Sequence, residues 1–176
     1  MDVALGLIAA NGASGMSMRM LAKECGLNVA AIYHYFDSKD ALVAAVVDER
    51  QYGARLAEIP EIDPSLPAPD RLERMFREIW EGALAEEPVW RVRLGEGLRG
   101  EAMVLPVGKD LLDVIGPGLS EWLRISLPEA NEPEAVAQML IGQLFAGFLR
   151  HIFEPDLDTE VIREHATVAL VAIVFD

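Results

Sequence analysis

Three positions between Ser17 and Phe36 constrain the fold more than any other feature of this chain. Ala22, Gly26 and Ile32 place a small residue, a glycine and a branched apolar residue at the spacing of two short helices that cross around a tight turn. The small residue permits the crossing, glycine adopts positive φ at low cost in the turn, and the branched residue packs back onto the first helix. The spacing therefore predicts a helix-turn-helix.

Polar residues mark where these helices begin. Ser17 and Asn28 are expected to cap the two helices, and Ser38 is expected to cap a fourth helix that runs toward Leu56. A small buried thiol is the ordinary role of a lone cysteine in such a segment. Three further residues are expected to supply the remaining apolar faces: Leu21, Cys25 and Phe36.

Helical periodicity continues along almost the whole chain and strand signals are poor, so the predicted fold class is all-α with about nine helices. Four prolines between Pro60 and Pro69 exclude regular helix there and indicate a loop. We expect two domains, at residues 1–50 and 51–176. The remaining helices are expected at residues 2–11, 70–86, 89–99, 107–127 (with a kink or break at 116–118), 133–153 and from 158 or 159 to the end.

The residues around the predicted turn resemble a known family. The sequence GLNVAAIYHYFDSKDAL at residues 26–42 is similar to the signature of the TetR (tetracycline-repressor-type) family, which has a recognition helix, an aromatic pair, a capped turn and a lysine. Residues 4–12 resemble that family's first helix, and the resemblance covers residues 2–47. It implies an N-terminal helix-turn-helix domain and a C-terminal ligand-binding and dimerisation domain. The implied function is a homodimeric transcriptional regulator, a repressor, that binds a palindromic or pseudo-palindromic operator and is released by a small, mostly apolar effector.

The resemblance implies that eight residues bind the double-stranded DNA operator. Residues 29–35 would form the recognition helix in the major groove. Asn28, Val29 and Ala31 would face the bases, and Arg19 would reach a guanine from the preceding helix. Phosphate contacts would come from four side chains: Ser17, Tyr33, His34 and Lys39.

Ordinary structural roles stay open for several of these residues. Tyr33 and Tyr35 are also compatible with a place in the core. Arg19 is compatible with a solvated helix face and His34 with the ordinary surface. The valine and alanines at 29–31 leave the base-facing surface short of polar groups, so the sequence does not specify which operator is read.

The last two helices are apolar on more than one face and therefore need burial on several sides. The monomer core covers one side, and a two-fold-related copy in a four-helix bundle would cover the other. A well-buried pair in a monomer is the alternative. The expected dimer interface consists of Val136, Met139, Gln143, Gly147, Val161, His165 and Val168.

Large and adaptable side chains in residues 51–176 favour a cavity for a mostly apolar small-molecule effector. Ordinary core packing is the alternative for each residue taken alone. An anionic group on the effector would find Arg91, Arg93 or Arg99. The fourth helix joins the two domains and is expected to transmit the signal. The expected effector-binding residues are Trp80, Trp90, Met103 and Met139.

The charge of the chain favours a second reading. The net charge is −14, yet residues 1–55 carry five basic and six acidic side chains, so the acid is concentrated in residues 56–176. A distant acidic part lowers non-specific affinity for DNA without preventing specific docking. The alternative function is accordingly a dimeric small-molecule-binding or scaffolding module with weak DNA affinity.

Several other classes find no support in the sequence. No catalytic constellation or phosphate-binding loop is present, so neither an enzyme nor a cofactor is expected. His151 and His165 lack a second ligand at helical spacing, so no metal is expected. No apolar stretch is long enough for a bilayer and no leader opens the chain, so we expect a cytoplasmic protein without a membrane partner.

Overall fold

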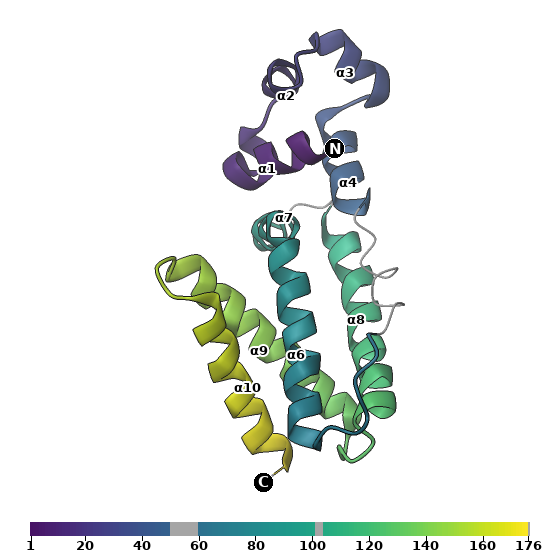
Figure 1. Ribbon diagram of the computed structural model, residues 1–176. Coiled ribbons are helices and arrows are strands. Elements are labelled where there is room, and N and C mark those ends of the chain that lie inside the picture. The colour runs from purple at the N-terminus through teal and green to yellow at the C-terminus, as the bar shows by residue number, and fades with distance from the viewer. Residues whose placement is uncertain (50–59, 101–103, 176) are drawn as a thin grey trace. The chain divides into compact units, whose positions relative to one another are not determined.

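The computed structural model describes residues 1–49, 60–100 and 104–175 (Figure 1). Within those ranges the chain forms nine helices and no strand, which confirms the predicted fold class. In chain order the helices are α1 (Asp2–Gly15), α2 (Met18–Glu24), α3 (Val29–Tyr35), α4 (Lys39–Glu49), α6 (Ala68–Ala85), α7 (Glu87–Leu98), α8 (Val104–Ser126), α9 (Pro133–Phe153) and α10 (Thr159–Phe175).

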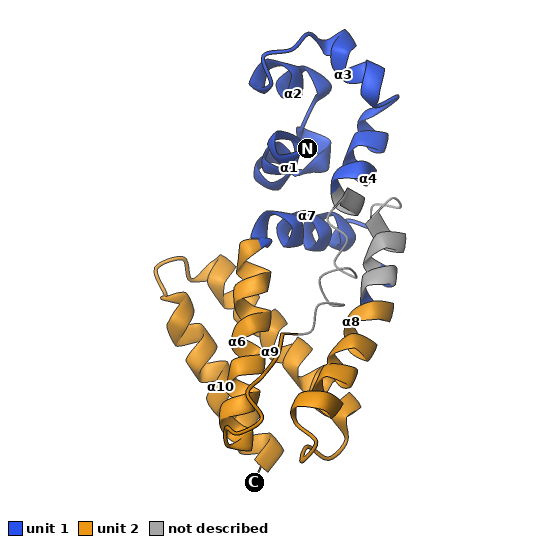
Figure 2. Ribbon diagram, turned by 45° about the vertical axis from the view of Figure 1, so that its right-hand side comes forward, with its two compact units in different colours: residues 1–52, 86–112 blue, residues 53–85, 113–176 orange. Residues whose placement is uncertain are grey.

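The helices form two compact units (Figure 2). They comprise Met1–Tyr52 with Glu86–Leu112 (unit 1) and Gly53–Ala85 with Asp113–Asp176 (unit 2). Helix α7 therefore belongs with the N-terminal helices, although the sequence placed every residue after 50 in the second domain. The reason is that Val89 and Val92 of α7 are buried in the same apolar cluster as the first four helices.

Unit 1 is built around that cluster, to which α1, α2, α3, α4 and α7 all contribute. Phe36 packs against its edge, as predicted. Cys25 was expected in this core and is instead exposed, because it is the C-cap of α2 and lies where the chain turns away. The buried members are Ala4, Leu5, Ile8, Met16, Met18, Leu21, Ala22, Ile32, Leu42, Val43, Val46, Val89 and Val92.

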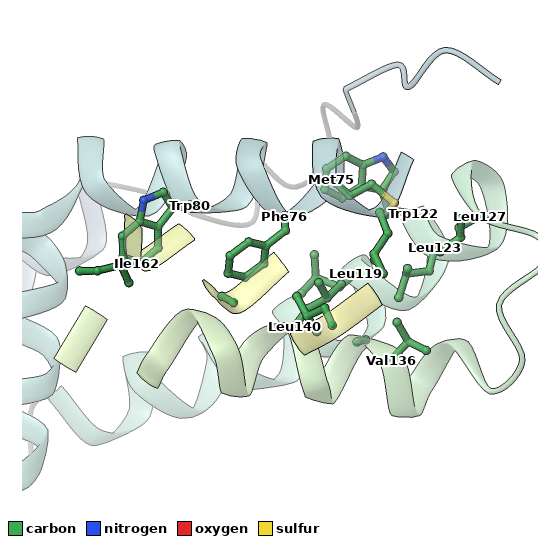
Figure 3. Close-up of a cluster of buried hydrophobic side chains, with 14 residues drawn as sticks. Met75, Phe76, Trp80, Leu119, Trp122, Leu123, Leu127, Val136, Leu140 and Ile162 are labelled. Carbon is green, nitrogen blue, oxygen red and sulfur yellow. The ribbon is translucent and has the colours of Figure 1, made fainter. Parts of the chain in front are cut away.

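Unit 2 has its own apolar cluster, between α6, α9, α10 and the C-terminal part of α8. Figure 3 shows Trp80 of α6 beside Ile162 of α10, and Phe76 farther along α6 on the way to Leu119. Trp80 and Phe76 have no exposed surface. The indole N–H of Trp122 donates to the carbonyl of Pro60 at 3.2 Å, so the loop before α6 is fastened to α8.

A buried arginine ties the connections of unit 2 together. Arg71 donates through Nη1 to the carbonyl of Ser126 at 2.8 Å and through Nε to the carbonyl of Leu66 at 3.1 Å. Its Nη2 pairs with Glu129 at 2.5 Å. One guanidinium therefore satisfies a carbonyl in the loop before α6 and a carbonyl at the end of α8, where helical partners are lacking.

Two helices in the second half differ in how closely they follow the expectation. Helix α9 begins at Pro133 and ends at Phe153 as predicted, whereas α8 runs without interruption through Pro117, where a kink or break was expected. By length and composition, α9 is the one helix in the described part of the chain that is long and apolar enough to cross a membrane. Its inner face, including Val136 and Leu140, packs into the unit 2 cluster, as core helices of globular proteins do.

Candidate functional site

The predicted corner between α2 and α3 is present. Ala22 and Ile32 are buried, and Gly26 has φ 65°, the left-handed region that favours glycine. The N–H of Leu27 donates to the carbonyl of Ala22 at 2.8 Å, and the N–H of Gly26 donates to Lys23 at 3.2 Å. These two bonds form a Schellman motif, which ends α2 and turns the chain into α3.

All three predicted caps are confirmed. Ser17 Oγ accepts the N–H of Met20 at 3.2 Å, and Asn28 Oδ1 accepts the N–H of Ala31 at 2.7 Å. Ser38 Oγ accepts the N–H of Ala41 at 3.0 Å. The three caps fix the starts of α2, α3 and α4. The predicted extension of α4 toward Leu56 lies outside the described residues.

The outward face of α3 differs in detail from the prediction. Val29 is half-buried against the unit 1 cluster, and Ala31 is also half-buried. Ala30, Tyr33 and His34 are exposed instead. Since successive residues are about 100° apart around a helix, burial of Ile32 turns Ala30 outward. The exposure of Ala30 could have been predicted from its position two residues before the buried Ile32, but the sequence analysis did not include it.

Aromatic side chains are exposed at the C-terminal end of α3. Tyr33 is 48% exposed and Tyr35 is 76% exposed, so neither belongs to the core. The rings of His34 and Tyr35 lie edge to face with centroids 5.4 Å apart. The sequence reasoning left Tyr35 among possible core residues, because an aromatic two positions from a phenylalanine in the core gives no local signal of exposure.

Two cations flank this surface. Arg19 is exposed on α2, as predicted. Lys39 lies at the start of α4, and its Nζ donates to the carbonyls of Ser14 at 3.2 Å and Met16 at 3.4 Å. An ammonium group has three donors, so these two bonds use two of the three donors of Lys39.

The expected effector-binding residues are distributed over both units. Trp80 is buried in unit 2, where its indole N–H has no hydrogen-bond acceptor among the described residues. Met139 is half-buried against the same cluster. Trp90 is half-buried on α7 in unit 1, and Met103 lies outside the described residues. The structure thus brings Trp80 and Met139 to one cluster.

The arginines named for an anionic effector group already have carboxylate neighbours or are buried. Arg91 pairs with Glu87 at 2.5 Å, and Arg99 pairs with Glu96 at 2.8 Å. Arg93 is buried on the same helix. No group of three or more His, Cys, Asp or Glu side chains in the described ranges is arranged to hold a metal ion.

The residues expected at a dimer interface fall into three classes of exposure. Val168 and His165 of α10 are exposed. Met139, Gln143 and Val161 are half-buried. The protomer itself covers the other two, Val136 and Gly147, in the unit 2 core.

A further row of apolar residues, which the sequence reasoning did not assign to an interface, lies on the outer side of α9. Phe145, Leu149 and Phe153 are 48%, 37% and 77% exposed. They repeat at four-residue spacing, so they share one helix face. Nearby, two hydrogen bonds from Arg150 hold the pKa of Glu154 below its ordinary value. The Nη1 of Arg150 also lies 3.5 Å from Nδ1 of His165 on α10.

A capped, exposed helix after a tight corner is the geometry of a helix-turn-helix, and the second unit is built from helices as well. The family model described as "Bacterial regulatory proteins, tetR family" matches residues 1–46, so this N-terminal segment is similar to that family. No functionally curated protein is similar enough to be counted as a relative.

Solved structures of transcriptional regulators share the fold over nearly the whole chain. One from Aquifex aeolicus VF5 has TM-score 0.72 and 18% identity, over 98% of this chain and 95% of that one. One from Rhodococcus sp. Rha1 has TM-score 0.72 and 23% identity, over 98% and 92%. FadR from Bacillus subtilis, solved with stearoyl-CoA, has TM-score 0.66 and 19% identity, over 97% and 95%. At these identities the likeness concerns the fold.

Proposed function

We propose that this chain is a homodimeric repressor that binds a palindromic operator through α2 and α3 and leaves it when a small, mostly apolar effector binds. The observation that carries the proposal is the surface of α3. Its residues Ala30, Tyr33 and His34 face outward, while three side-chain caps and a Schellman turn hold the helix in place. A short, rigidly mounted helix with an exposed face is the geometry that enters a major groove.

Each group on this surface matches a feature of DNA. The Arg19 guanidinium can donate two hydrogen bonds to guanine. The methyl group of Ala30 suits the methyl group of thymine. Phosphates are contacted by Tyr33, His34, Tyr35 and the remaining donor of Lys39. Ser17 and Asn28 contribute mainly by capping, because their side-chain oxygens already accept backbone N–H groups.

The homodimer is supported by the outer face of α9. Phe145, Leu149 and Phe153 form an apolar row, and Val168 on α10 is 70% exposed. Isolated apolar residues are common on surfaces, but a continuous row along a helix indicates a partner. A second copy meets this row with its own in a two-fold interface. Two recognition helices then reach successive major grooves when they are roughly 34–36 Å apart.

The effector site is placed around Trp80 and Met139. A buried indole N–H without an acceptor is costly, and a ligand carbonyl would satisfy it. The Trp80 side chain is fully enclosed, so a ligand can bind only when the unit 2 cluster opens. This opening changes the conformation of unit 2, which also carries the proposed dimer face. Because FadR of Bacillus subtilis has this fold and was solved with stearoyl-CoA, a long-chain acyl thioester is the effector class to test first.

The effector acts by differential affinity. A ligand that binds better to a dimer with another spacing of its recognition helices shifts the population away from DNA. By reciprocity, the operator weakens ligand binding by the same factor. Equal affinity for the effector with and without operator would contradict this mechanism.

A second function is favoured by the net charge of −14 and by the apolar face of α3. It is a dimeric small-molecule-binding module with weak DNA affinity. Selection of operators from a random duplex library, followed by a salt titration, separates the two. The repressor requires one enriched palindrome and an affinity that falls steeply with salt. Affinity without an enriched sequence supports the module.

Variants assign the DNA contacts once the operator is known. Arg19→Ala should cost about 1–3 kcal/mol and relax the preference at one base position. Lys39→Ala should weaken binding to all sequences and reduce the salt slope. Arg74→Ala, which removes an exposed arginine of α6, is the matched control and should leave both quantities unchanged.

Effector binding is tested by calorimetry with stearoyl-CoA. Trp80→Phe keeps the ring and removes the N–H, and it should weaken binding by about tenfold if a ligand carbonyl takes that hydrogen bond. Trp122→Phe is the matched control, because that N–H is already bonded to Pro60. Absence of binding to the wild type would exclude this effector class.

A further inference from the structure

A buried carboxylate on α7 reaches a break in α1, and both helices belong to unit 1. Glu96 is 1% exposed. Its Oε1 accepts the backbone N–H of Ala13 at 2.8 Å and a hydrogen bond from Nη1 of Arg99, also at 2.8 Å. The bond to Ala13 joins residues 83 positions apart in the sequence.

The break explains why Ala13 needs an acceptor from elsewhere. Gly12 has φ 73° and ψ 162°, so the helix is interrupted there and its last turn starts again at Ala13. The first N–H groups of a helical turn have no carbonyl partner within the turn. A side-chain oxygen of the preceding residue ordinarily serves as the cap. Glycine has no such oxygen, and Glu96 supplies it from α7.

The same short segment also binds α4 and starts α2. Lys39 of α4 donates to the carbonyls of Ser14 and Met16. Ser17 then caps α2. We call residues 12–17 the junction segment. Contacts from α7 and α4 therefore meet within a few residues of the first helix of the helix-turn-helix.

Stability alone does not account for a carboxylate at this position. The second oxygen of Glu96, Oε2, is buried and has no hydrogen-bond partner among the described residues. An unpaired buried oxygen of a charged group is costly, and such groups in native structures need a specific explanation. Keeping the charged side chain here is explained if its bond to Ala13 fixes the geometry of the junction segment.

We propose that Glu96 is a positioning residue that couples α7 to the recognition helix through the junction segment. A displacement of α7 moves the cap of Ala13, and with it the start of α2. This route is separate from α4, the element expected from the sequence to carry the signal. The inference concerns the regulation of DNA binding and in that respect rests on the proposed function.

The test combines two measurements on the full chain: hydrogen exchange of individual backbone amides, and affinity for the selected operator at a temperature where every variant is folded. Glu96→Ala removes the cap and should speed exchange at Ala13 and in α2 by about tenfold, with operator affinity about tenfold weaker. Glu96→Gln keeps an oxygen for Ala13, so both quantities should stay within about threefold of wild type. Glu121→Ala, which breaks an exposed pair with Arg124 of the same spacing, should change neither.

Two results would overturn the inference. One is unchanged exchange in α2 in Glu96→Ala relative to Glu121→Ala. The other is a Glu96→Gln variant as impaired as Glu96→Ala. If Glu96→Ala does not fold, Glu96→Gln is compared with Glu121→Gln instead. Amide exchange or operator affinity that differs tenfold between these two variants would also overturn the inference. A wild type that selects no operator counts against the proposed function alone, because amide exchange still measures the coupling.

Discussion

Gly147 of α9 lies against the indole ring of Trp80 with no space for a side chain between them. A Cβ at position 147 would stand 2.9 Å from Cζ3 of Trp80 and 3.1 Å from Cγ2 of Ile162. Helices α6, α9 and α10 meet at this point of the unit 2 core. The glycine is therefore required by close packing, since it lies inside a regular helix where its backbone freedom is not needed.

Gly147→Ala should lower the free energy of unfolding by about 1–3 kcal/mol, the usual cost of overpacking a core. Thermal unfolding followed by circular dichroism measures the effect. Gly82→Ala is the matched control in α6, because a Cβ there meets nothing within 4 Å. That change should stabilise the protein by about 0.5–1 kcal/mol. Equal effects of the two variants would contradict the packing argument.

The pair of Arg71 and Glu129 should make stability depend on pH. The hydrogen bond from Arg71 lowers the pKa of Glu129 below its ordinary 4.5 in the folded state. A lowered folded-state pKa contributes stability above pH 4.5 that is lost as the pH falls through the folded pKa. Glu129→Gln should therefore lower the unfolding midpoint at pH 7, and the difference from wild type should vanish in acid.

The control for that experiment is Glu164→Gln, at an exposed position on α10. It should leave the unfolding midpoint close to wild type at both pH values. A Glu129→Gln variant whose deficit persists in acid would show that the amide perturbs packing instead of removing an ion pair.

The main contribution of Asn28 should be to stability, as the cap of α3, and its contribution to DNA recognition should be secondary. Asn28→Ala removes the acceptor for the N–H of Ala31 and should cost about 1 kcal/mol in urea unfolding. Asn28→Asp keeps the oxygen and should retain stability, while its negative charge weakens operator binding. Asn131→Ala, at an exposed position before α9, provides the baseline. If Asn28→Asp were as unstable as Asn28→Ala, the cap would not be the cause.

The apolar row on α9 should determine the oligomeric state. Leu149→Glu places a charge in the middle of the proposed interface and should convert the dimer to a monomer in sedimentation velocity. Leu98→Glu introduces the same charge at a leucine that is 89% exposed on α7, and it should leave the dimer intact. A wild-type protein that sediments as a monomer at micromolar concentration would refute the interface.

Local features were predicted well because they depend on neighbours in the sequence. The corner at Ala22, Gly26 and Ile32 is present, and so are the caps at Ser17 and Asn28. Each depends on residues within about ten positions of one another, where spacing alone specifies the contact. The limits of α9 followed from a proline at its first position and an acidic break after its last turn.

Features that depend on distant residues were not predicted. The place of α7 in unit 1 rests on Val89 and Val92, whose apolar character fits either unit equally well. The bond between Glu96 and Ala13 joins two helices whose packing no local pattern specifies. The exposure of Cys25 depends on the direction in which the chain leaves α2.

The contribution of α7 to unit 1 limits how the helix-turn-helix can be transferred to another chain. A module cut from the chain after α4 would lack Val89 and Val92 and would therefore carry an unfinished core. In a chimera, residues 1–49 on the body of another regulator would depend on whatever side chains the host offered at those places. Transplanting α7 together with the first four helices keeps the core of the module complete. The segment to transfer is therefore made of two stretches that are separated in the sequence.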